Sequence, residues 1–290
     1  YRGSPLGAVD QQFNRAENIL TESKVFFREA LNEDLAATAI WGAQQANIRG
    51  DGATDGVYSL WYGKGPGVDR SGDVFRHANL AGTDPNGGVL VAMGDDHTGE
   101  SSTALHQSEY ALIDSMIPIF SPAGVQELLD FGVLGWELSR FAGVWVGLKC
   151  MKDTVEVTEV VDGSVERIEV KKPVFSFPEE GVQIRTNDLA AIQEERLHKV
   201  KIPAVKAFAR ANNLNKVVFS KEGAKIGLVS AGKSWLDTVH ALDLLGINEQ
   251  KARELGISTF KVGLVWPLEE ETLVEWASGL DLIIVLEEKR

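Results

Sequence analysis

The chain has 290 residues, 44% of them hydrophobic, which is enough to bury the cores of one large or two ordinary domains. Acidic residues outnumber basic ones by 42 to 29, and the net charge of −13 argues against a nucleic-acid partner, which needs clustered cations. The single cysteine, Cys150, excludes an internal disulfide and a cysteine-ligated iron–sulfur or multi-cysteine zinc site built from this segment alone. A reducing, cytoplasmic setting fits this composition. No long apolar run or signal-peptide pattern appears, so we expect no membrane association.

Residues 1–150 alternate apolar strands with helix-like stretches, which predicts an α/β domain with a buried, mostly parallel sheet. The expected strands are Val57–Tyr62, Val89–Met93, Ile117–Phe120 and Val144–Lys149, and the expected helices lie near 33–49, 72–81, 101–115 and 124–141. The clearest helix starts at Asn32, a good N-cap, with Glu33 and Asp34 in its first turn. Glycine-rich turns at 63–67 and 94–99 follow two strands, where ligands bind in parallel α/β sheets.

The rest of the chain divides into two further parts. Residues 151–223 are expected to form a β-hairpin appendage around Asp162-Gly163, because charged and β-branched residues alternate there, followed by a charged helical connector. Residues 224–290 begin a second α/β unit. Its expected elements are a strand at Ile226–Ser230, a helix at Trp235–Leu245, a strand at Lys261–Val265, a helix at Glu269–Ala277 and a strand at Leu282–Leu286. Both ends of the chain read as cut, so we expect it to be part of a longer protein.

One motif fits a nucleotide-binding P-loop by its letters. The run is Gly227-Leu-Val-Ser-Ala-Gly232-Lys233-Ser234. A P-loop needs a strand before its first glycine and a flexible loop between the glycines, whereas the apolar Leu228-Val229 lies between them here. We expect a strand to pass through Gly227 and end near Gly232, so ATP binding is the weaker reading.

Several segments of residues 1–150 together resemble one enzyme family. The turn Tyr1-Arg2-Gly3-Ser4-Pro5, the segment Asn32-Glu33-Asp34, and the strand that ends in Asp95-Asp96 before Ser101-Ser102 are similar to those of 2-oxoacid:ferredoxin oxidoreductases. The run from Gly65 to Gly72 resembles the indolepyruvate type of that family. The resemblance implies a thiamine diphosphate-binding, pyrimidine-type domain over 1–150 and a transketolase C-terminal-like domain, possibly truncated, over 224–290.

The resemblance also implies site residues. It makes Glu33 the catalytic carboxyl group that meets a ring nitrogen of the cofactor's pyrimidine, with Gly65 and Gly67 beside the cofactor. Ser4, Arg70 and Lys64 become candidates for contacting a 2-oxoacid, although serine stands at Ser4 where the family has threonine. Each of these residues also has an ordinary reading: an acid favoured at a helix N-terminus, a capping hydroxyl, or a solvated cation.

Other polar residues near these turns carry weaker predictions. Asp95 and Asp96 fit turn and capping roles better than a paired-carboxylate site. His97 and His106 are possible pocket residues, and Cys150 reads as a small buried hydrophobe. We predict no metal site within the chain.

The implied reaction is oxidative decarboxylation of a 2-oxoacid to an acyl-CoA, with electrons passed to ferredoxin. Indolepyruvate or another aryl 2-oxoacid is the implied substrate. Mg²⁺ and 4Fe–4S clusters are expected on parts of the enzyme outside this chain, together with the remaining domains or subunit, and the enzyme is expected to be a homo-oligomer such as a dimer. Two alternatives stay open: a P-loop nucleotide hydrolase and a non-catalytic α/β interaction domain. This segment alone is expected to be inactive.

Overall fold

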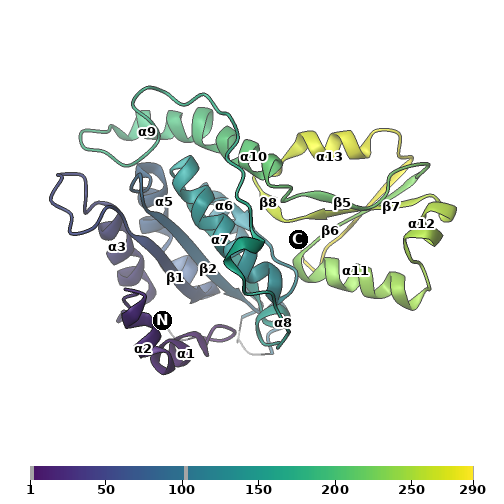
Figure 1. The fold of residues 1–290 in the computed structure, drawn as a ribbon, viewed down its shortest axis with the longest axis horizontal. Coiled ribbons are helices and arrows are strands. Elements are labelled where there is room, and N and C mark those ends of the chain that lie inside the picture. Colours follow the sequence, from purple (N-terminus) through teal and green to yellow (C-terminus); the bar gives the residue numbers. More distant parts are fainter. Residues whose placement is uncertain (1–2, 101–103, 290) are drawn as a thin grey trace.

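The computed structural model describes residues 3–100 and 104–289, which form two lobes that are each built on one sheet (Figure 1). The strand order is β1-β2-β4-β3-β8 in the first sheet and β5-β7-β6-β9 in the second. The predicted α/β fold class with parallel sheets is therefore confirmed. None of the described helices combines the length and the apolar character that crossing a membrane requires.

The first sheet has a parallel core. Its parallel strands are β1 (Tyr58–Lys64), β2 (Gly88–Asp95), β4 (Trp145–Met151) and β3 (Ile119–Phe120), and β8 (Leu264–Trp266) is added antiparallel to β3. The inner strand β2, between β1 and β4, is buried along its whole length, as its continuous apolar run predicts. The four strands expected in residues 1–150 are all present.

Helices cover both faces of this sheet. Val89, Val91 and Met93 of β2 point into one core cluster with α3 (Glu33–Gln44) and α5 (Gly72–Ala81). The alternate residues of β2, Leu90 and Ala92, join the opposite cluster. Its helices are α7 (Val125–Ala142) and α10 (Ile202–Ala211). The remaining helices of this lobe are α1 (Val9–Arg15), α2 (Glu17–Glu22), α4 (Gly65–Arg70), α6 (Glu109–Asp114), α8 (Lys152–Val155) and α9 (Ala190–Arg196), and a π-helical turn at Leu197–Lys201 links α9 to α10.

The second lobe is smaller. Its strands are β5 (Lys216–Phe219), β7 (Ile257–Val262), β6 (Ile226–Ala231) and β9 (Leu282–Leu286), of which β7, β6 and β9 are parallel. The helices α11 (Gly232–Leu244) and α12 (Glu249–Leu255) lie on one side of the sheet and α13 (Glu270–Ala277) on the other (Figure 1). A small core forms around Phe260 and Trp276, whose rings lie 5.1 Å apart.

The two sheets are joined directly at Gly263. The chain leaves β7 in the second sheet and enters β8 in the first with only this residue between them. A Cβ atom at Gly263 would lie 2.3 Å from the carbonyl oxygen of Leu214, so only glycine fits. The side chain of Asn215 accepts hydrogen bonds from the backbone N–H groups of Gly263 and Leu264, at 2.9 and 3.0 Å. This crossover fixes the edge of one sheet against the other.

Two predictions about the chain after residue 150 are wrong. The hairpin expected around Asp162-Gly163 is absent, because residues 156–189 contain one 3₁₀ turn and no strand. This segment instead runs along the first lobe and packs Ile168, Val170, Phe175 and Phe177 against its core. The strand expected at Lys261–Val265 is divided between β7 and β8. The expected helical connector is formed by α9, the π-helical turn and α10, and β5 follows it. The boundaries at 150 and 223 stay predictions, and β5, which precedes residue 223, joins the same sheet as β6, β7 and β9.

Candidate functional site

Glu33 lies where the prediction placed it, in the first turn of α3 beside the carboxyl end of β1. The side chain of Asn32 caps the helix by accepting a hydrogen bond from the backbone N–H of Leu35 at 2.8 Å. The indole N–H of Trp61, in β1, donates to the carbonyl oxygen of Glu33 at 3.0 Å. The start of α3 is therefore tied to the sheet, and the Glu33 side chain is only 7% exposed.

Two predicted residues contact the Glu33 side chain. A Cβ atom at Gly67 would lie 2.5 Å from Cγ of Glu33, so the absence of a side chain makes room for the carboxyl group. Arg70 donates from Nη1 to Oε2 of Glu33 at 3.4 Å and is otherwise 58% exposed. Both residues belong to α4, which replaces the glycine-rich turn expected there. A helix is possible because Pro66 occupies its first turn, where its missing N–H costs nothing.

The other predicted turns meet at the same edge of the sheet. A Cβ atom at Gly3 would lie 3.2 Å from the Lys64 side chain, and one at Gly94 would lie 3.0 Å from Pro5. Ser4 is half-buried between these contacts and precedes a cis peptide bond to Pro5. Tyr1, Arg2, Ser101 and Ser102, which contributed to the sequence motifs, lie outside the described residues.

Beside Gly65 lies a histidine held between two acids. His106 contacts Asp69 through Nε2 at 2.9 Å and lies 3.7 Å from Asp95 through Nδ1. The nearby carboxyl groups of Asp95 and Asp69 raise the pKa of His106 to about 9, so the ring is an imidazolium cation at neutral pH. A Cβ atom at Gly65 would lie 2.0 Å from the His106 ring. His106 thus bridges α4 and the end of β2, a role that sequence spacing did not reveal.

The two predicted aspartates have capping roles. Asp95 is fully buried and accepts hydrogen bonds from the backbone N–H and the hydroxyl of Ser108, at 2.8 and 2.6 Å. Asp96 accepts from the hydroxyl of Thr98 and the backbone N–H of Gly99, which forms the expected turn. Cys150 is buried as predicted, and burial raises the pKa of its thiol to about 12.

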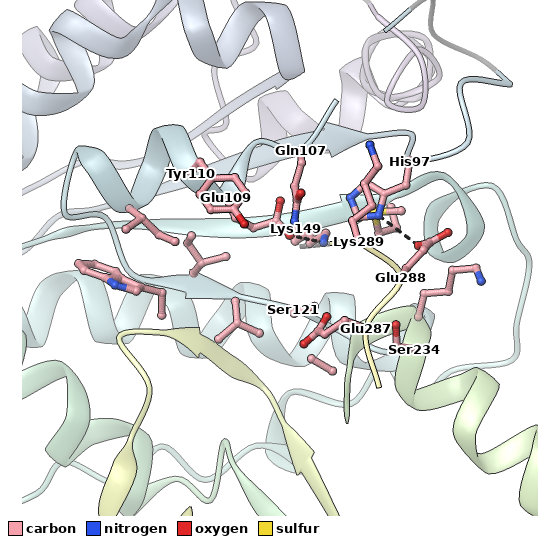
Figure 2. A pocket seen from close by; sticks show the side chains of 17 residues that line it. His97, Gln107, Glu109, Tyr110, Ser121, Lys149, Ser234, Glu287, Glu288 and Lys289 are labelled. Carbon is pink, nitrogen blue, oxygen red and sulfur yellow. Dashed lines mark hydrogen bonds and ion pairs between the residues drawn. The ribbon is translucent and has the colours of Figure 1, made fainter. Parts of the chain in front are cut away.

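A cavity of about 200 Å³ lies between the lobes, where the carboxyl ends of strands from both sheets converge (Figure 2). His97, Glu109 and Lys149 line it from the first lobe, and Ser234 and Glu288 line it from the second. His97 donates from Nδ1 to Oε2 of Glu288 at 3.1 Å. Burial and the nearby Lys149 ammonium lower the pKa of His97, so its ring is neutral. No sequence motif indicated this cavity, because its walls come from segments almost 200 residues apart.

The P-loop pattern does not form a phosphate-binding loop. Gly227 to Ala231 lie in β6, so the strand passes through Gly227 and ends before Gly232 as predicted. This strand pairs with β7 on one side and β9 on the other. Gly232 has a positive φ of 49° and opens the turn into α11. Lys233 forms an ion pair with Asp237 at 2.7 Å, one turn along the same helix. These contacts leave no backbone cradle for a phosphate between the two glycines.

Comparison with known proteins shows which proteins this chain is similar to. Residues 216–290 match the family described as the indolepyruvate oxidoreductase domain. The whole chain is 24% identical to the indolepyruvate oxidoreductase subunit IorA of Methanothermobacter marburgensis and 24% identical to that of Pyrococcus abyssi, over 99% of its length in each case. The chain is related to the indolepyruvate oxidoreductases. The predicted resemblance is confirmed. The matches cover 43% and 42% of those two subunits, so the chain spans less than half of the curated relatives it matches.

Solved structures share the fold of this relative of the indolepyruvate oxidoreductases. A 2-oxoglutarate:ferredoxin oxidoreductase from Magnetococcus marinus, solved with 2-oxoglutarate, coenzyme A and succinyl-CoA bound, superimposes with a TM-score of 0.66 at 16% identity. That match covers 98% of this chain and 53% of the other. A split-gene transketolase, in the form of an inactive β4 tetramer, superimposes with a TM-score of 0.52 at 15% identity, over 97% of this chain and 69% of the other. The two-lobed architecture is thus the one found in these two enzymes.

Proposed function

We propose that this chain is the part of a thiamine diphosphate-dependent 2-oxoacid:ferredoxin oxidoreductase that holds the aminopyrimidine end of the cofactor. The observation that carries the proposal is Glu33. Its carboxyl group is buried at the carboxyl edge of a parallel sheet. The Asn32 cap and the Trp61 indole hold the backbone that carries this side chain. The fold and the family relationship support the same assignment.

The residues around Glu33 fit an aminopyrimidine ring. Among the described residues, the polar contact of the carboxyl group is the long one to Arg70, at 3.4 Å, so the carboxyl group can still share a hydrogen bond with a ring nitrogen. Gly67 lets the carboxyl group lie against α4 without a clash. When bound, thiamine diphosphate supplies the carbanion chemistry that breaks the bond to the carboxylate carbon of the substrate. Glu33 holds the proton at the ring nitrogen and thereby favours the imino form of the exocyclic nitrogen.

Three polar side chains are assigned to the 2-oxoacid. Arg70 is half-exposed beside Glu33 and can turn its guanidinium to a substrate carboxylate, for which two-pronged hydrogen bonding suits arginine. Lys64 and Ser4 lie at the same sheet edge, near Gly3 and Pro5. The names of the relatives favour indolepyruvate or another aryl 2-oxoacid as the substrate. Coenzyme A and ferredoxin complete the proposed reaction, with Mg²⁺ and 4Fe–4S clusters held by other parts of a cytoplasmic, oligomeric enzyme.

Glu33→Gln in the whole enzyme tests the proposal. The change is nearly isosteric but removes the acid, and positioned acid–base groups contribute about 10²–10⁴-fold in rate. We expect the 2-oxoacid-dependent reduction of a viologen dye to fall by roughly that factor, with an unchanged melting temperature. Asp34→Asn is the matched control because Asp34 occupies the same helix turn and its side chain is half-buried. If Glu33→Gln keeps full turnover, Glu33 only stabilises the helix N-terminus and the alternative of a non-catalytic domain gains support.

A further inference from the structure

A cluster of side chains that the proposed function does not use lies at the wall of the cavity between the lobes, which two of its members, His97 and Glu109, line. One ligand-type atom from each of Asp95, His97 and Glu109 lies within 4.8 Å of the other two. These residues come from the end of β2, the turn after it and the first turn of α6. Within the part of the chain described here, this is the group with the composition and spacing of a metal site.

Two atoms of this cluster are buried without a hydrogen-bond partner in the described structure. The His97 side chain is only 4% exposed, and its Nε2 atom has no partner. Oε2 of Glu109 is likewise buried and unpaired. Leaving a buried polar atom unpaired costs about 1–3 kcal/mol. A cation bound to both atoms would remove that cost, because an imidazole nitrogen and a carboxylate oxygen each offer a lone pair to a metal ion.

Each of the three side chains is also held by a contact with a residue outside the cluster. Nδ1 of His97 faces Glu288 at 3.1 Å, an arrangement that places the ring proton on Nδ1 and leaves the Nε2 lone pair free. Asp95 is held by the backbone and hydroxyl groups of Ser108. Lys149 pairs with Oε1 of Glu109 and not with Oε2. Figure 2 shows the His97 ring between Glu288 and the Glu109–Lys149 pair. Such outer contacts are typical of metal-binding histidines and carboxylates.

The charge around the cluster also favours a cation. Asp95, Glu109 and Glu288 bring three carboxylates, whereas Lys149 brings one ammonium group. His106 faces Asp95 from the far side, but Asp69 balances its charge. Lys233 and Lys289, which also line the cavity, are engaged with Asp237 and with the carbonyl oxygen of Leu105. Glu287 also lines the cavity, so carboxyl groups outnumber the unengaged ammonium groups around the cluster.

We infer that Asp95, His97 and Glu109 bind a divalent transition-metal ion, of which Zn²⁺ fits best. One imidazole nitrogen and two carboxylate oxygens are ordinary zinc ligands, whereas Mg²⁺ and Ca²⁺ prefer oxygen alone. Tetrahedral coordination at about 2.0–2.2 Å needs ligand atoms roughly 3.3 Å apart, so small side-chain rotations from the observed spacing suffice. Three protein ligands leave a fourth position, and two of these ligands, His97 and Glu109, line the cavity of about 200 Å³. Water or a small carboxylate can occupy it.

The test is Zn²⁺ titration of the metal-stripped protein by calorimetry, with Co²⁺ as a spectroscopic probe. We expect one Zn²⁺ per chain and visible absorption bands of Co²⁺ in a site of nitrogen and oxygen ligands. His97→Gln and Glu109→Gln should each weaken Zn²⁺ binding by more than 100-fold, because each removes a ligand. Glu288→Gln should weaken it by about 10–100-fold, as the loss of an outer contact does.

The controls separate this site from other binding. His240→Gln changes an exposed histidine on α11 and should leave the Zn²⁺ affinity unchanged. Thermal melting of each variant checks folding, and Glu109→Gln is nearly isosteric, so it keeps the test open if His97→Gln fails to fold. The inference is overturned if no Zn²⁺ binds, if Mg²⁺ binds as tightly as Zn²⁺, or if Zn²⁺ binding survives both His97→Gln and Glu109→Gln. None of these outcomes depends on thiamine diphosphate or on turnover.

Discussion

Gly67→Ala tests whether the position of Glu33 matters as well as its charge. The new methyl group would lie 2.5 Å from Cγ and 2.9 Å from Cδ of Glu33, so either Glu33 or α4 must shift. The φ angle of Gly67 is not positive, so alanine fits the backbone itself. In a helix, alanine replacing glycine gains about 0.5–1 kcal/mol, whereas overpacking a buried site costs about 1–3 kcal/mol. The clash therefore outweighs the helical gain.

The expected consequence for catalysis is large. A misplacement of about 1 Å in a catalytic group can cost about 10²-fold in rate, so turnover of the Gly67→Ala enzyme should fall by roughly that factor. The carboxyl group of Glu33 is still present in the Gly67→Ala enzyme, which distinguishes this variant from Glu33→Gln. The assay is 2-oxoacid-dependent dye reduction, measured together with the melting temperature. Gly72→Ala is the matched control, since its methyl group would meet only Nη1 of Arg76, at 3.6 Å. Full turnover in the Gly67→Ala enzyme would refute the reasoning.

Two further predictions concern lysines. Burial, reinforced by the Arg196 charge, lowers the pKa of Lys201 to about 7 from an ordinary 10.5. Between these pH values the unfolded chain binds more protons than the folded chain, so the free energy of unfolding rises with pH there. Between pH 7 and 9 we expect the free energy of unfolding of the wild type, measured by denaturant melts, to rise by about 2 kcal/mol. Lys201→Met should not show this rise, and pH profiles of the two proteins that run in parallel would contradict the prediction. For Lys233, whose ammonium group pairs with Asp237, ATP binding should be undetectable by calorimetry before and after Lys233→Ala. Mg²⁺-dependent ATP binding that the substitution abolishes would reverse this conclusion.

Local signals in the sequence were sufficient for the elements that hold Glu33. Asn32 is a strong cap, and the apolar runs of β1, β2 and β4 are long enough to mark buried parallel strands. The alternation of charged and β-branched residues at 154–170 wrongly predicted a hairpin. An extended segment that packs one side on a core has the same two-residue period as a paired strand. Ile168 and Val170 pack in this way without a strand partner.

Contacts between segments far apart in the chain could not be predicted from the sequence. The three residues of β8 are too few to show a pattern, and the crossover at Gly263 depends on the close approach of the Leu214 carbonyl group. The contact between His97 and Glu288 joins residues 191 positions apart, and the sequence around neither residue indicates it. Gly67 was predicted as a cofactor-binding residue, but its contact with Glu33 across 34 positions became visible only in the structure.

The most direct test of the proposed function is a structure of the whole enzyme with thiamine diphosphate bound. We predict that a carboxyl oxygen of Glu33 lies about 2.6–3.2 Å from a pyrimidine ring nitrogen, with Gly67 beside the ring and the Arg70 contact to Glu33 loosened or lost. A pyrimidine ring bound elsewhere, with Glu33 still paired to Arg70, would contradict the account.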